Sequence, residues 1–232
     1  MTVNVPGHGS RQGPSPLEGE RIRPLSRWQI EDRLEELGDL YAETSGGGPG
    51  DWNEGRRLFL RRLAAEVQRP GFALLVAERN VLGEPPGPGR TAGTGDVTRR
   101  REGVVVTGCG YGFPVHGQGP WWRGLDGYLP PELLRLAATG RLFAVSGLVV
   151  HSGVRTRDQG RDWNLARRLQ RRLLADHAAG LAGHPAVLGV TLADRSDTAT
   201  LRALRSWGWR SVPAGARATP RSVRWRALVI GP

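Results

Sequence analysis

The run from Leu142 to Val150 constrains the fold of this chain more than any other segment. It reads Leu-Phe-Ala-Val-Ser-Gly-Leu-Val-Val, so it is apolar on whichever side of a strand its residues face. A strand that is apolar on both faces belongs to a sheet that is covered on both sides. We therefore expect a central strand here, in a layered α/β domain.

Helical and strand patterns alternate around this central strand. Ser26, followed three residues later by Gln29, forms a capping-box pattern that starts a helix running past Tyr41. A turn over residues 151–160 follows the central strand, and a long helix is predicted after it, over residues 163–182. The other predicted elements are helices over 53–68, 132–138 and 198–206, and strands over 72–78, 104–113, 187–192, 209–212 and 223–230.

The length of 232 residues suits one domain with a short tail. We expect a disordered leader over residues 1–24, one domain over 25–232, and a mobile insertion over 83–103, which is rich in glycine and proline. The leader has no apolar core of a signal peptide, and no apolar run has the length of a membrane span. The single cysteine, Cys109, excludes an internal disulfide and a multi-cysteine metal site. These features predict a cytoplasmic protein with no metal and no membrane partner.

The net charge of +11 raises the question of a nucleic-acid partner. All 33 basic residues are arginine and none is lysine, which indicates a codon bias toward arginine rather than a binding patch. The sequence contains no helix-turn-helix, zinc or aromatic-stacking signature. An arginine-rich nucleic-acid-binding protein therefore stays only as an alternative, although the positive field would attract any anion, including a phosphorylated cofactor.

The segment after the central strand carries a family motif. Residues 161–166 read Arg-Asp-Trp-Asn-Leu-Ala and align with the pattern Gln/Arg-x-x-Gly-x-Gly/Ala. A register starting at Gln159 would place Arg171 and Arg172 on the apolar side of the following helix, so we prefer the register that starts at Arg161. This strand, turn and helix resemble the phosphate-binding unit of the GNAT (GCN5-related) N-acetyltransferases, of which the chain is identified as a divergent member.

Two further blocks support this resemblance, and together the three cover about residues 25–232. Residues 197–209, from Asp197 to Trp209, resemble the family's late Asn-x-x-Ala-x-x-Leu-Tyr-x-x-x-Gly-Phe block, with Leu204 in place of the tyrosine. In the first half, two amphipathic helices lead through Arg-Pro-Gly-Phe at 69–72 into a strand. The next strand contains Gly-Tyr-Gly at 110–112 and precedes Trp121 and Trp122.

The resemblance implies a GNAT-type fold, in which a mixed central sheet is flanked by helices. It also implies an N-acetyltransferase that binds acetyl-CoA or another acyl-CoA as co-substrate, and a small-molecule or protein amine that attacks the thioester directly. A helix N-terminus would bind the pyrophosphate through its N–H groups and dipole. The cofactor-binding residues that the resemblance implies are Leu148, Val149, Val150, Arg161, Asp162, Trp163, Asn164, Leu165, Ala166, Arg167 and Asp197.

The acid and the base are harder to assign. Relatives often carry a glutamate on the central strand at the position that Gly147 occupies here, and Leu204 cannot protonate the leaving thiolate. His151 and Tyr111 are the remaining candidates. Trp121 and Trp122 are expected either to line the acceptor pocket or to cap the edge of the core. We expect Asp162 to be the N-cap of the long helix. A catalytically degenerate GNAT-fold module, which binds CoA or serves as an interaction domain, is the other alternative.

Overall fold

The structure, a computed structural model, describes residues 20–44, 49–80, 103–116, 129–158, 164–183, 185–213 and 225–231. A seven-stranded mixed sheet has the order β1-β2-β3-β4-β5-β7-β6. The strands are β1 (Arg21–Pro24), β2 (Ala73–Asn80), β3 (Val104–Pro114), β4 (Leu142–Val150), β5 (Leu188–Asp194), β6 (Arg210–Ser211) and β7 (Trp225–Ile230). The helices are α1 (Arg27–Glu31), α2 (Leu34–Thr44), α3 (Pro49–Val67), α4 (Pro131–Ala138), α5 (Ser152–Arg157), α6 (Leu165–Ala179) and α7 (Thr198–Ser206).

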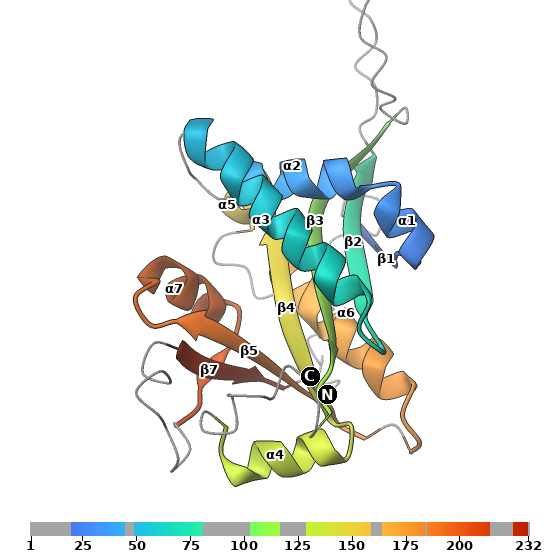
Figure 1. The fold of residues 1–232 in the computed structure, drawn as a ribbon, viewed down its shortest axis with the longest axis vertical. Helices are drawn as coiled ribbons and strands as arrows, with labels where there is room; N and C mark the ends of the chain where they lie inside the picture. Colours follow the sequence, from blue (N-terminus) through green and yellow to red (C-terminus); the bar gives the residue numbers. More distant parts are fainter. Residues whose placement is uncertain are drawn as a thin grey trace, which may run out of the picture.

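The central strand and the α/β class are confirmed. β4 lies between β3, with which it is antiparallel, and β5, with which it is parallel. Helices α2 and α3 cover one face of the sheet and α6 covers the other (Figure 1). The alternation along β2 shows the two faces: Leu74 and Val76 pack with α2 and α3, whereas Leu75 packs with α6.

The predicted first helix is two helices in the structure. The capping box at Ser26 and Gln29 is present, with both of its hydrogen bonds. However, α1 ends at Glu31 and α2 begins at Leu34. Between them, Arg33 is turned toward the sheet, where it forms ion pairs with Glu36 and with Glu78 of β2. The break between the two helices thus places the Arg33 guanidinium beside this largely buried carboxylate.

The predicted boundary of the leader is wrong. Residues Arg21–Pro24, expected to be disordered, form β1 and pair antiparallel with Leu75–Glu78 of β2. A bidentate ion pair between Arg23 and Glu78 stabilises this strand pairing. Residues 1–19 and nearly all of the predicted insertion, residues 83–103, lie outside the described residues.

The connection after β4 also differs from the prediction. Residues 151–160 were expected to be an open turn, but Ser152–Arg157 form the short helix α5. The following helix, α6, begins at Leu165 and ends at Ala179, inside the predicted range of 163–182. The extra turn of helix thus stands directly before the N-terminus of α6, and it contributes to the site described below.

Candidate functional site

The two central parallel strands separate along their length. β4 and β5 pair only between Leu142–Ala144 and Leu188–Val190, and beyond these residues they diverge (Figure 1). A β-bulge in β4 lies at the point of divergence: Tyr111 pairs with Gly147 and Gly112 pairs with Val145, so Ser146 is an extra residue. Bulges bend a strand and re-aim its side chains. The backbone of β4 beyond Ser146 is therefore exposed toward β5 without a strand paired to it on that side.

The gap between the strands is a cavity of about 540 Å³, which we call the strand cavity. It is lined by β4 from Val145 to Val150, by Thr191 and Leu192 of β5, and by α7. A second cavity of about 550 Å³, the helix cavity, is lined by α5, by residues 164–167 and by the other side of α7. The two cavities adjoin, since Val150, Arg155 and Ala203 line both.

The cavities bring together the predicted cofactor residues that the structure describes. Leu148, Val149, Val150 and Asp197 line the strand cavity, whereas Asn164, Leu165, Ala166 and Arg167 line the helix cavity with Val150. Arg161, Asp162, Trp163, Trp121 and Trp122 lie outside the described residues.

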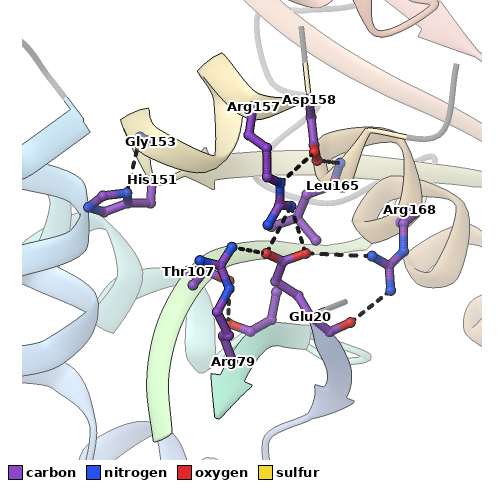
Figure 2. Close-up of polar contacts among 10 residues, drawn as sticks. Glu20, Arg79, Thr107, His151, Gly153, Arg157, Asp158, Leu165 and Arg168 are labelled. Atoms are coloured by element: carbon purple, nitrogen blue, oxygen red, sulfur yellow. Dashed lines mark hydrogen bonds and ion pairs between the residues drawn. The ribbon is translucent and has the colours of Figure 1, made fainter. Parts of the chain in front are cut away.

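The N-terminus of α6 is capped by the chain itself. Asn164, and not Asp162 as predicted, is the N-cap, because its Oδ1 accepts a hydrogen bond of 2.9 Å from the N–H of Arg167. The N–H of Leu165 donates to Oδ2 of Asp158, a buried carboxylate at the end of α5, at 3.2 Å. Figure 2 shows Asp158 between Arg157 and Leu165. An anion at this helix N-terminus thus meets donors that already bind protein oxygens.

A buried carboxylate lies beneath this junction. Glu20 is 2% exposed and forms ion pairs with Arg79 of β2 and with Arg157 of α5, while its backbone oxygen accepts from Arg168 of α6 at 2.7 Å (Figure 2). Burial alone would raise the pKa of Glu20, but the hydrogen bond from Arg79 and the charge of Arg157 outweigh burial and lower it. The start of the described chain therefore fixes α5 and α6 relative to the sheet.

A polar cluster that the sequence analysis missed faces the strand cavity from α3. Ser146 Oγ donates to Oε1 of Glu66 at 2.7 Å, and Nε of Arg62 donates to the same oxygen at 3.1 Å. The spacing in the sequence could have revealed this glutamate. Glu66 follows Leu63 by three residues and so lies on the buried side of the helix. A charged residue on an apolar helix face needs a partner or a function.

The two candidates for acid and base lie elsewhere. His151 is the N-cap of α5: its Nδ1 accepts from the N–H of Gly153 at 3.1 Å, and Nε2 lies 3.5 Å from Glu43. It is not among the residues that line either cavity. Tyr111 is 2% exposed, and burial raises the pKa of its phenol well above the ordinary value. Its ring fills the space beside Gly147, so it forms part of the core behind β4.

Comparison with known proteins identifies the architecture. No protein-family model matches the chain, and no curated protein matches it significantly. Among solved structures, PaiA N-acetyltransferase from Thermoplasma acidophilum, in complex with coenzyme A, is similar with a TM-score of 0.50 and 11% identity over 92% of this chain and 99% of that chain. The chain has the GNAT fold. A Desulfovibrio desulfuricans protein described as a GNAT acetyltransferase is also similar, with a TM-score of 0.47 and 12% identity over 91% of this chain and 98% of that one.

The features of the candidate site meet at the two cavities. The separated strands, the bulge and the N-terminus of α6 all border the two adjoining cavities. Gln170 links α6 to the end of α7. Its amide nitrogen donates to the carbonyl of Trp207 at 2.8 Å, and its amide oxygen accepts from Nε1 of Trp209 at 2.9 Å. Within the described residues, no helix has the length and apolar character to cross a membrane.

Proposed function

We propose that this protein is an N-acyltransferase that binds an acyl-CoA in the gap between β4 and β5 and transfers its acyl group to an amine. The observation that carries the proposal is the separation of these strands at the Ser146 bulge, which opens the strand cavity along an unpaired edge of β4. The sequence motif independently points to the same cavities.

The β4 edge supplies what an acyl donor needs. Backbone N–H and C=O groups of Leu148 to Val150 can hydrogen-bond a pantetheine arm in the manner of an added strand. A backbone N–H at the thioester can also stabilise the oxyanion of the tetrahedral intermediate. Because these donors are backbone groups, the role does not depend on side-chain identity. Holding the amine and the thioester together supplies a further part of the rate acceleration.

The helix cavity suits the phosphates of the cofactor. The N-terminus of α6 carries a partial positive charge, and Arg155, Arg167 and Arg202 line the same cavity. Ala166, at the second helical position, lets a ligand approach the backbone closely. Asp158 opposes an anion at this place, so the affinity for the cofactor reflects a balance between the arginines and this carboxylate.

The test is release of CoA thiol from acetyl-CoA in the presence of benzylamine, glycinamide or a short peptide with a free N-terminus. Ala203 lines both cavities, so Ala203→Trp should fill them and abolish thiol release and acetyl-CoA binding. Ala138→Trp, at an exposed position of α4, is the control and should leave both unchanged. Thiol release by Ala203→Trp at the wild-type rate would contradict the proposed site.

A second candidate is a GNAT-fold module that binds CoA without catalysis. Two observations favour it: Leu204, which lines the strand cavity, cannot donate a proton, and Asp158 and Asn164 occupy N–H groups of α6. Saturable acetyl-CoA binding without thiol release toward any amine would support this candidate over the acyltransferase.

A further inference from the structure

Glu66 is a buried carboxylate with unused hydrogen-bonding capacity. Glu66 is 7% exposed and lies on α3 among side chains that pack on the sheet. Oε1 accepts from Ser146 and from Arg62, whereas Oε2 is buried and accepts no hydrogen bond from the described residues. Buried polar atoms in folded proteins are nearly always paired, so an exception calls for an explanation.

Ser146 lies between this carboxylate and the strand cavity. Because of the bulge, Ser146 faces α3. Gly147, the next residue, lies against the ring of Tyr111 on the same side of the sheet. Ser146 lines the strand cavity, and its Oγ is 2.7 Å from Oε1 of Glu66. The hydroxyl thus bridges the open cavity and the buried carboxylate.

The neighbouring charges keep this bridge in one orientation. Nη2 of Arg62 donates to both the carbonyl oxygen and Oγ of Ser146, at 2.9 Å each. Since Oγ accepts from Arg62, its own hydrogen points to Glu66, and one acceptor position remains for a group in the cavity. Within the described residues, Tyr111 on β3 and Tyr41 on α2 also interact electrostatically with Arg62, and burial raises the pKa of Tyr111, which keeps its phenol neutral.

We propose that Ser146 and Glu66 form a proton relay, in which Ser146 contacts the acceptor amine and Glu66 receives the proton. The inference rests on the proposed acyltransferase function. As the amine nitrogen forms its bond to the thioester carbon, its proton passes to Ser146 Oγ while the hydroxyl proton passes to Oε1 of Glu66. The C–S bond then breaks, and the proton returns through Ser146 to the CoA thiolate. The products are the amide and CoA thiol, with Glu66 ionised again.

Three variants of the full chain test the relay with the amine that gives the fastest thiol release. Glu66→Gln keeps the size of the side chain and an acceptor for Ser146 but removes the proton acceptor, so kcat should fall about 100-fold. Ser146→Ala should lower kcat similarly, and the double variant should be no slower than the slower single one, because the two residues act as a unit. Glu54→Gln, at an exposed position of the same helix, is the matched control and should keep the wild-type kcat.

The pH profile separates a proton relay from a structural role. Without the relay, the proton must leave to solvent base, so the rate deficit of Glu66→Gln should narrow as the pH rises. The Kd of acetyl-CoA, measured by calorimetry, and the Tm should stay near the wild-type values. Unchanged kcat in Glu66→Gln, or a deficit that is constant across pH or matched by a weaker Kd, would overturn the relay while the acyltransferase function stands. A wild-type protein that releases no thiol with any amine would instead overturn the proposed function itself, and the relay with it.

Discussion

The contact between Gly147 and Tyr111 shows how one residue shapes the site. A Cβ at position 147 would lie 2.1 Å from Cε1 and 2.6 Å from the hydroxyl oxygen of Tyr111. The tyrosine ring is fully buried and cannot move aside without disturbing the core between α3 and the sheet. Gly147 is therefore a packing requirement of this chain, and in the proposed relay the acidic group, Glu66, comes from α3.

Gly147→Ala should destabilise the protein by about 1–3 kcal/mol, because the added methyl group overpacks a closed core. Chemical denaturation gives the free energy of unfolding. Gly231→Ala, which adds a methyl group where no atom lies within 4 Å, is the control and should change stability little. Equal stability of Gly147→Ala and the control would show that Tyr111 does not hold this position.

At the scale of elements, the junction of α5 and α6 sets the charge of the helix cavity. Asp158 accepts the N–H of Leu165 and pairs with Arg157, so a negative charge sits at the positive end of α6. This arrangement stabilises the free protein. It also opposes a phosphate at the same helix end.

Asp158→Asn should therefore bind acetyl-CoA more tightly, by a few fold, because a charge at a helix terminus is worth about 0.3–1 kcal/mol. Calorimetric titration measures the change in Kd. Asp176→Asn, which removes an exposed ion pair with Arg172 far along α6, is the matched control. Weaker binding by Asp158→Asn would mean that this carboxylate organises the cofactor site rather than competing with its ligand.

Glu20 contacts three elements, β2, α5 and α6, and should matter for stability. Glu20→Gln removes the charge that holds Arg79 and Arg157, and hydrogen bonds to charged groups are worth about 1.5–3 kcal/mol. We expect a loss of this size in the free energy of unfolding. Glu132→Gln breaks an exposed pair with Arg135 and should cost about 0.5 kcal/mol or less. A loss in Glu20→Gln no larger than in Glu132→Gln would contradict the structural role of the buried carboxylate.

At the scale of the whole molecule, the buried Glu20 and the partly buried Glu78 predict sensitivity to acid. The pKa values of Glu20 and Glu78 are lowered, since hydrogen bonds from Arg79 to the first and from Arg23 and Arg33 to the second outweigh burial. Each contributes stability that is complete above the unfolded value of about 4.3 and is lost as the pH falls through the lowered folded pKa. Unfolding free energies measured from neutral pH down to about pH 3 should fall steeply below pH 4.3 in the wild type. The fall should be shallower in Glu20→Gln, and parallel curves would contradict this assignment.

The sequence predicted the architecture better than the details of the site. β4 and α7 have the predicted bounds because an apolar run and a capped amphipathic helix are local signals. β1 was missed because its four residues gain their pairing from β2, some fifty residues away. The relay partners Glu66 and Ser146 are eighty residues apart and meet only through a bulge that has no local signature. Patterns of hydrophobicity could be read from the sequence, but long-range polar contacts could not.

Binding of an acyl-CoA in the gap between β4 and β5 can be measured by calorimetric titration of the full chain with acetyl-CoA. The titration is run beside desulfo-CoA and at two salt concentrations, because arginine-rich surfaces bind anions in a salt-dependent way. We expect saturable one-to-one binding that survives moderate salt and is lost in Ala203→Trp. No binding at millimolar acetyl-CoA, or binding that Ala203→Trp retains, would contradict this expectation.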